Sequence, residues 1–254
     1  MPTSRKPSAR ILVAITLVFG AASLCSAGTI IVGTPADSDE GNAFPFGGAF
    51  NGEYQQVYTN SLFSGPITIT GLEFFNTQFN DDATAMNTGT FTISLSSTSA
   101  DWDTLSSTPA NNIGVNNTEV FSGSLAQPWA FGDTLTITFS TPFTYTPGPG
   151  ANLLVDIVST GTDDAGGLIF FDENGYNNGG RNGNTIFGRE YDGTSESDPV
   201  SGVDSGFGLV TGFETTTPEP GTLSLFVVSL IGLAMARRCA TTRRTCARPG
   251  SGGA

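Results

Sequence analysis

Acidic residues gather in four segments of this chain, and their spacing suits a hard divalent cation. The segments are Asp37–Glu40, Asn80–Asp82, Asp172–Asn174 and Asp192–Asp198. Carboxylates two residues apart in a loop can converge on one oxygen-liganded ion, of which Ca²⁺ is the natural candidate. The candidate ligands are Asp37, Asp39, Asp192, Glu196 and Asp198. None of the segments has EF-hand spacing, and a solvated acidic surface is the alternative interpretation.

A second group of residues could act on carbohydrate. Asp101 and Asp103 flank Trp102, which gives two carboxylates beside an aromatic ring, as in a glycosidase or a sugar-binding face. Aspartates in a Ser/Thr-rich connector also stabilise turns through their side-chain oxygens, which is the alternative. Five aromatic residues could stack on sugar rings if they shared an exposed face, or could instead pack within sheets. They are Tyr54, Tyr58, Trp102, Trp129 and Tyr176.

Composition excludes several kinds of chemistry. The chain has no histidine, so catalysis by Ser-His-Asp or Cys-His groups is impossible. Between Gly28 and Thr217 there are two arginines against 22 acidic residues and no cysteine, which gives a net charge of −20. Such a surface repels nucleic acid and anionic lipid headgroups. Any metal bound there would have oxygen ligands, and we expect no disulfide in this part of the chain.

The elements that must position these residues have the periodicity of β-strands. Apolar residues alternate with threonine and serine over residues 90–95 and 134–139, which is typical of half-buried antiparallel strands. Further candidate strands are Thr29–Val32, Tyr54–Tyr58, Ile67–Phe75, Leu153–Val158, Leu168–Phe171, Thr185–Phe187 and Phe207–Phe213. Turn signals such as Asn51-Gly52 and Asp192-Gly193 separate them. No sustained helical pattern occurs in this region.

These patterns predict an all-β body, residues 28–214, built as an antiparallel two-sheet sandwich of jelly-roll type. The 19 phenylalanines supply the bulk for a core layer about 10 Å thick. Thr215–Thr217 is predicted as a short linker to the C-terminal segment.

Residues 1–27 have the pattern of a secretory signal peptide. A basic start with Arg5, Lys6 and Arg10 precedes an apolar stretch from Ile11 to Leu24. Small residues follow, and the predicted cleavage point lies between Ala27 and Gly28. We therefore expect the body to be exported.

The C-terminal segment has three parts in a fixed order. Pro218-Glu219-Pro220 comes first, then an apolar stretch from Gly221 to Ala236, then Arg237 and Arg238. As a helix, residues 221–236 would reach about 24 Å, against a hydrocarbon thickness of about 30 Å. The arginines predict that the C-terminus stays in the cytoplasm while the preceding chain is outside. We expect a single C-terminal transmembrane helix here.

This arrangement resembles the PEP-CTERM proteins of Gram-negative bacteria over about residues 217–244, with Pro218, Glu219 and Pro220 as the signature. The resemblance implies a sorting signal, residues 218–244, that an exosortase-like membrane protease or transpeptidase recognises and processes, often in bacteria that make exopolysaccharide. Residues 245–254 extend past the usual basic end of such signals.

The sequence therefore leads to an expectation about function and to an alternative. We expect a non-enzymatic, exported protein of the cell envelope or extracellular matrix with a structural or adhesive role, anchored in the inner membrane before processing. The alternative is a lectin-like module that contacts exopolysaccharide and depends on Ca²⁺. A glycan hydrolase or lyase that uses carboxylates is a third possibility, without positive support. An exposed aromatic platform would favour the lectin, and two facing carboxylates in a cleft would favour the enzyme.

Overall fold

The computed structural model describes residues 25–35, 41–77, 86, 88–163, 169–177 and 180–218. It confirms an all-β architecture in which every described strand pairing is antiparallel. The strands are β1 (Cys25–Val32), β2 (Asn51–Tyr58), β3 (Ile67–Phe75), β4 (Thr90–Thr98), β5 (Thr118–Gly123), β6 (Thr134–Tyr145), β7 (Asn152–Thr160), β8 (Glu173–Asn174), β9 (Tyr176–Asn177), β10 (Gly180–Arg181), β11 (Phe187–Ser195), β12 (Asp198–Ser205), β13 (Gly208–Leu209) and β14 (Thr211–Pro218). Two single-turn 3₁₀ helices are η1 (Asn60–Leu62) and η2 (Pro109–Asn111).

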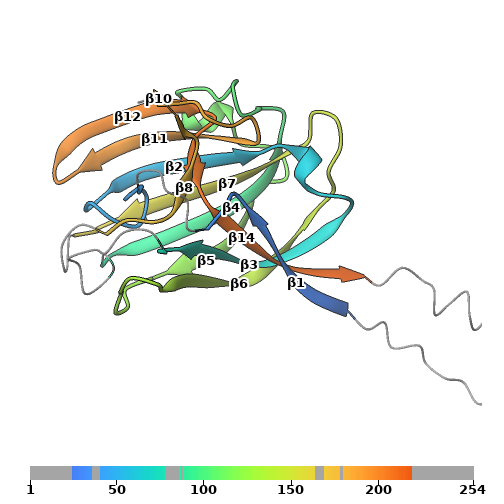
Figure 1. Ribbon diagram of the computed structural model, residues 1–254, viewed down its shortest axis with the longest axis horizontal. Helices are drawn as coiled ribbons and strands as arrows, with labels where there is room; N and C mark the ends of the chain where they lie inside the picture. Colours follow the sequence, from blue (N-terminus) through green and yellow to red (C-terminus); the bar gives the residue numbers. More distant parts are fainter. Residues whose placement is uncertain are drawn as a thin grey trace, which may run out of the picture. The chain divides into compact units, whose positions relative to one another are not determined.

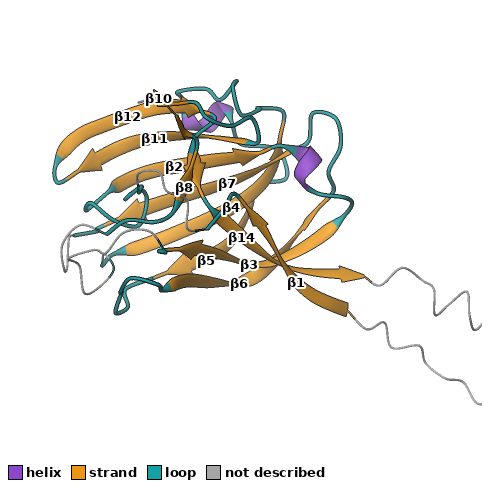
Figure 2. Cartoon of the chain, viewed as in Figure 1, coloured by secondary structure: helices purple, strands orange, loops and turns teal. Residues whose placement is uncertain are grey.

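Two sheets contain the long strands (Figures 1 and 2). One has the order β1-β14-β3-β6, and the other has the order β12-β11-β2-β7-β4-β5. Two short pairs, β9 with β10 and β8 with β13, complete the described ladders. Some neighbouring strands are distant in sequence. The first and last described strands, β1 and β14, pair along their whole length.

One core cluster joins the inner faces of the two large sheets. Tyr58 of β2 meets Phe213 of β14 edge to face, with ring centroids 4.9 Å apart. The loop before β2 adds Phe46, whose ring lies 4.8 Å from that of Phe74 in β3 and 5.7 Å from that of Phe91 in β4. Burial of such large rings is the main stabilising contribution, about 1.5–3 kcal/mol for each. Most described phenylalanines are thus core residues, as the sequence predicts.

The long hairpin β11–β12 corrects the expectation of an acidic loop at Asp192–Asp198. Asp192 lies within β11, Asp198 begins β12, and only Glu196 and Ser197 form the turn. Both turn residues have positive φ, 49° and 78°, as a two-residue hairpin turn of type I′ requires. Pairing with β2 holds this Gly- and Asp-containing segment extended despite its weak strand propensity.

The chain ends also differ from expectation at one point. Thr215–Thr217, predicted as a linker, belong to β14, which continues to Pro218. Thr215 is buried and donates its hydroxyl hydrogen to the carbonyl oxygen of Gly28 at 2.9 Å. Strand β14 therefore reaches the first residue of the Pro-Glu-Pro motif. The predicted membrane helix at 221–236 lies outside the described residues, and no helix within them is long and apolar enough to span a membrane.

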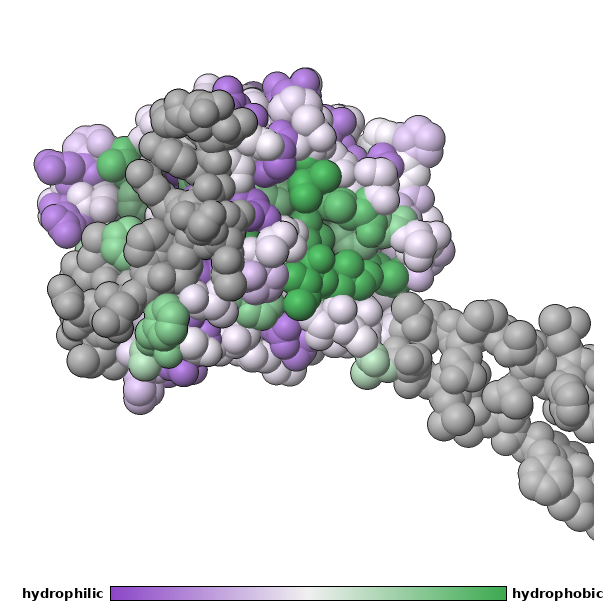
Figure 3. All heavy atoms as spheres, in the orientation of Figure 1, coloured by the Kyte–Doolittle hydropathy of each residue, from purple (hydrophilic) through white to green (hydrophobic). Residues whose placement is uncertain are grey.

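The face drawn in Figure 3 carries an apolar area among hydrophilic residues. Among the described residues, the large apolar side chains that are exposed are Ile31, Val115 and Phe131. They come from three different segments, β1 and two loops, of which Ile31 is 48% exposed. Single exposed apolar residues are normal for a folded protein, whereas the apolar area in Figure 3 is continuous.

Candidate functional site

Only three of the five predicted cation ligands lie in the part of the chain that the structure describes. Asp37 and Asp39 lie outside the described residues. Asp192, Glu196 and Asp198 are spread along the β11–β12 hairpin. In the part of the chain that the structure describes, no group of three or more acidic residues, cysteines or histidines could hold a metal ion.

The acidic pair around Trp102 forms a turn. One carboxylate oxygen of Asp101 accepts a hydrogen bond from the Trp102 amide at 2.8 Å, and the Thr104 amide donates to the Asp101 carbonyl at 3.0 Å. Asp103 is exposed, and Trp102 is half-buried. This arrangement matches the turn interpretation of Asp101 rather than a catalytic pair.

Most of the proposed sugar-stacking aromatics are core residues. Tyr54 and Tyr58 are each 1% exposed, and Trp129 is 2% exposed. The Trp129 ring lies 4.9 Å from that of Phe171. These three residues cannot present a face to a sugar. The side chain of Tyr176 lies outside the description, so only Trp102 remains partly accessible.

A buried arginine dominates the inner face of the six-stranded sheet. Arg189 of β11 is 2% exposed, and its Nε and Nη2 donate to one carboxylate oxygen of Asp204 in β12, each at 2.8 Å. The guanidinium carbon lies 4.3 Å from the ring centroid of Phe207 and 5.0 Å from that of Tyr191. Nη1 makes no hydrogen bond. A guanidinium tolerates this setting because its planar, weakly hydrated surface packs on aromatic rings.

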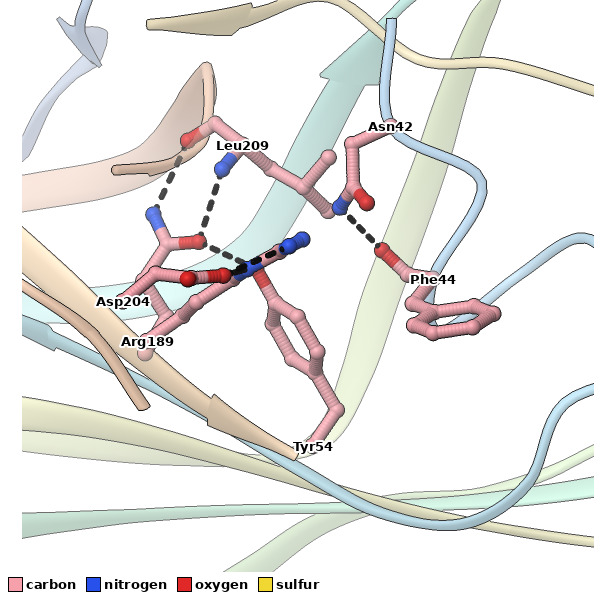
Figure 4. A network of polar contacts seen from close by, with 7 residues as sticks. Asn42, Phe44, Tyr54, Arg189, Asp204 and Leu209 are labelled. Atoms are coloured by element: carbon pink, nitrogen blue, oxygen red, sulfur yellow. Dashed lines mark hydrogen bonds and ion pairs between the residues drawn. The ribbon is translucent and has the colours of Figure 1, made fainter. Parts of the chain in front are cut away.

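Beside Arg189, a polar network joins β2 to β13 (Figure 4). The Tyr54 hydroxyl of β2 donates to Gln56 Oε1 at 2.7 Å. The Leu209 amide of β13 donates to the same oxygen at 2.8 Å, and Gln56 Nε2 donates to the Leu209 carbonyl at 2.9 Å. Burial raises the pKa of Tyr54 well above its usual range, and the positive charge of Arg189 opposes part of that rise. Tyr54 thus stays a neutral donor, and the network fixes the short strand β13 to the sheet.

The opposite face of the same sheet carries a row of acidic groups. Asp156 of β7 and Glu190 of β11 each pair with Gln55 of β2, one on either side. Two residues along each strand, on the same face, Glu53 of β2 pairs with Asp192 of β11. Gln55 Nε2 donates to Glu53 at 2.9 Å and to Asp156 at 3.3 Å. Four carboxyl groups therefore share one face of three adjacent strands.

Burial and mutual repulsion hold protons on two of these acids. Asp156 and Glu190 are buried, and Glu190 Oε2 has no hydrogen-bond partner. Burial, followed by the charge of Glu53, raises the pKa of Asp156 to about 7. Burial, followed by the charges of Glu53, Asp192 and Asp156, raises the pKa of Glu190 to about 8. A carboxylic acid is neutral in such surroundings because the charged form is poorly solvated.

The connection between β4 and β5 covers this acidic row. Asn112 donates to Gln55 Oε1 at 2.9 Å, and Gln55 donates to the Pro109 carbonyl at 3.2 Å. Leu105 of the same connection packs with Val57 and Leu154 in a small second core. Gly188 and Gly114 permit the close approach, since a Cβ at either would collide with the carbonyl oxygen of Trp102 or Ser97, respectively. Asp156 and Glu190 are therefore enclosed, whereas Glu53 is half-buried and Asp192 is exposed at the end of the row.

A pocket of about 360 Å³ lies elsewhere, at the terminal strands. Its lining comes from β1, β3 and β14: Ala27, Gly28, Thr29, Thr70, Glu214 and Thr215. Burial, followed by the charge of Glu214, raises the pKa of nearby Glu73. The pocket holds the predicted signal-cleavage point, Ala27–Gly28, and lacks a second acid on its wall that could pair with Glu214 for hydrolysis.

At the same end of the body, the last residues of the predicted signal peptide lie beside the first residue of the predicted sorting signal. In the β1–β14 ladder, Ala27 pairs with Thr216, Ser26 with Thr217 and Cys25 with Pro218. The first residue of the Pro-Glu-Pro motif thus lies opposite the last residues of the predicted signal peptide. Glu219, Pro220, Arg237 and Arg238 lie outside the described residues.

Comparison with protein-family models, curated proteins and solved structures finds no match to this chain.

Sequence reasoning missed Arg189, Gln55, Asp156 and Glu190 as the groups with unusual surroundings. Asp156 stands in a strongly apolar strand, Leu153–Val158, and a lone acid in such a strand is the signal that could have identified it. Glu190 and Gln55 carry no comparable signal, because their proximity to Asp156 depends on the strand register.

Proposed function

We propose that this chain is an exported β-sandwich protein of jelly-roll type with a structural or adhesive role at the cell envelope or in the extracellular matrix. It reaches that place through a C-terminal PEP-CTERM signal with a single membrane helix at 221–236, processed by an exosortase-like enzyme of the inner membrane.

The observation that carries the proposal is the position of the two terminal signals. Strand β14 reaches Pro218, and Pro218 pairs with Cys25 in β1. The export signal and the sorting signal therefore leave the body from paired strand ends. A protein held at a membrane by both ends during export would need them on the same side of its folded body.

The body itself supports a role that does not involve catalysis. Its unusual ionisable groups, Arg189, Asp156 and Glu190, are buried. Arg189 pairs with Asp204, and Asp156 accepts a hydrogen bond from Gln55, which also bonds the covering loop. The strongly negative charge favours solubility outside the cell. Burial of Tyr54, Tyr58 and Trp129 removes most of the aromatic platform that a lectin-like role would use.

Expression of the full chain in a Gram-negative host that has an exosortase-like enzyme tests the proposal. Intact-mass measurement should find a mature protein that begins at Gly28 and ends near Pro220. A matched variant in which Pro218, Glu219 and Pro220 are replaced by alanine should keep its C-terminal segment and stay in the membrane fraction. A wild-type protein that retains Arg237 and Arg238, or that remains in the cytoplasm, would overturn the proposal.

A further inference from the structure

The last residues of β14 depend on β1 alone for strand pairing. On its β3 side, the β14 ladder ends at the pair Thr216–Thr68. On its β1 side, the ladder continues through Thr217 and Pro218, whose partners are Ser26 and Cys25. Both partners belong to the predicted signal peptide.

We infer that removal of the signal peptide unmasks the C-terminal sorting site by withdrawing the strand that pairs with Thr217 and Pro218. This inference rests on the proposed function, and it adds an order of events: the N-terminal cut precedes and permits the C-terminal one.

The N-terminal cut is a hydrolysis. Water adds its hydroxyl to the carbonyl carbon of Ala27 and a proton to the nitrogen of Gly28, and the bond between them breaks. Cys25, Ser26 and Ala27 then leave with the signal peptide. Thr216 keeps its partner in β3, whereas Thr217 and Pro218 have no strand partner on either side.

The rest of the ladder survives the cut. Residues 28–32 remain paired with residues 211–215. Val32 is buried in the core, Ile30 packs against it, and the Thr215 hydroxyl bonds the Gly28 carbonyl. The cut therefore divides β1 into two parts. Residues 28–32 stay attached to the core, whereas residues 25–27 are attached to the body only by their pairing with β14. The fold persists while the β14 end is released.

A released strand end is what a processing enzyme requires. Enzymes and receptors that bind extended peptides form main-chain hydrogen bonds along the peptide edges, as in strand addition. A cleft that encloses the peptide contacts both edges, so a strand already paired with β1 cannot enter it. Thr217 and Pro218 directly precede Glu219 and Pro220 in the sequence, so their release frees the chain immediately before the rest of the motif.

Three variants of the full chain test the order of events in the host described above. Ala27→Arg blocks the N-terminal cut, because signal peptidases require a small residue there. The Ala27 side chain is exposed, so the fold accommodates the larger residue. Adding Ser26→Pro removes a backbone donor opposite Thr217 and disrupts the ladder without restoring the cut. Adding Ser26→Ala instead is the matched control, because alanine keeps the donor.

We expect the wild-type chain to lose its C-terminal segment and the Ala27→Arg chain to retain it. The Ala27→Arg, Ser26→Pro chain should lose the segment again, and the Ala27→Arg, Ser26→Ala chain should retain it. Loss of the segment from Ala27→Arg at the wild-type rate, or its retention in the proline variant, would overturn the inference.

Hydrogen exchange separates this inference from the proposed function. In purified full-length Ala27→Arg protein, whichever of the Thr216 and Thr217 amides faces β1 should exchange about tenfold more slowly than in protein that begins at Gly28, as expected for loss of one backbone hydrogen bond. Equal exchange rates would overturn the inference even if sorting occurs. Retention of the tail by the wild-type chain would overturn the proposed function, and the exchange rates would still decide the pairing.

Discussion

Arg189 and Glu190 are neighbours on β11, yet the two faces of the sheet treat their charges differently. Both side chains are almost fully buried, at 2% and 1% exposed. Arg189 lies on the inner face, where Asp204 neutralises it and two aromatic rings cover it. Glu190 lies on the outer face among Glu53, Asp156 and Asp192, with no positive charge among the groups that shift its pKa.

The difference shows two solutions to burying an ionisable group. A guanidinium cannot lose its proton near neutral pH, so its site must supply a negative partner. A carboxyl group can instead keep its proton and become a neutral acid. The inner face therefore depends on an ion pair that is stable over a wide pH range, whereas the outer face depends on protons and should respond to pH.

Removing the buried arginine should have the largest effect. Arg189→Ala leaves Asp204 without its cation and exposes the faces of Phe207 and Tyr191, so we expect a loss of about 3–5 kcal/mol in the free energy of unfolding. Urea denaturation of residues 28–218 measures this. Asp204→Asn should also destabilise the protein, because it leaves the buried guanidinium of Arg189 without a negative partner. Asp198→Asn, at the exposed end of the hairpin, is the control and should change stability little. A loss below about 1 kcal/mol for Arg189→Ala would mean that the inner-face ion pair is not structural.

The second test raises the pH. The carboxyl pKa rises on folding from 3.8 to about 7 for Asp156 and from 4.5 to about 8 for Glu190. Between these values the folded state binds more protons than the unfolded state, so stability falls as pH increases. The contribution of these two acids to the free energy of unfolding is fully present below about pH 4 and is lost as the pH rises through 7 and 8. The slope should reach about 1.4 kcal/mol per pH unit for each group, less where the two are coupled.

Glu190→Gln tests whether Glu190 is the source of this slope. Glutamine keeps the shape of the protonated acid, so the variant should match the wild type near pH 5 and exceed it by about 1–3 kcal/mol at pH 8.5. Asp198→Asn, at the exposed end of the hairpin, is the control and should leave the slope unchanged. A wild-type stability that is flat from pH 5 to 8.5 would contradict the account of the outer face.

The sequence predicts some strands of this fold and misses others. The residue pattern of Ile67–Phe75 predicts β3 with its observed bounds, because most of its apolar side chains are the buried ones. The β11–β12 hairpin was missed as a hairpin, since Gly193 and Asp192 disfavour strands locally and only pairing with β2 holds them extended. Local pattern predicts strands that bury one face, and it fails where tertiary pairing overrides propensity.

The site residues show the same limit. Spacing along the chain predicts Asp37, Asp39, Asp192, Glu196 and Asp198 as ligands, and such a prediction assumes that ligands come from one loop. Asp156 and Glu190, the buried acids, are 34 positions apart and share one face of the sheet because each pairs with Gln55 from opposite sides. Strand register determines such groups, and a single sequence without structure does not specify the register.

A third, smaller effect concerns the loop over the acidic row. Asn112→Ala removes the donor to Gln55 Oε1, and a buried acceptor left unbonded costs about 1–3 kcal/mol. The matched control is Asn111→Ala, whose side chain is exposed and should matter little. Chemical denaturation at pH 5 measures the difference, since Asp156 and Glu190 are then protonated in both proteins. Equal stability of the two variants would mean that the loop does not close the outer face.

The smallest effect should come from an acid pair at the surface. There water solvates the charges, so neither an ion pair nor a retained proton is needed. Glu73 and Glu214 lie on neighbouring strands, and burial followed by the charge of Glu214 raises the pKa of Glu73. Both side chains are only half-buried, so solvent screens their repulsion.

Glu214→Gln should lower the pKa of Glu73 and change stability by no more than about 0.5 kcal/mol. Titration of the Glu73 carboxyl by NMR measures the first effect, with exposed Glu119→Gln as a control that should not move it. An unchanged Glu73 pKa would leave burial as its sole cause, and a stability change comparable to that of Glu190→Gln would mean that solvent exposure does not separate the two acid clusters.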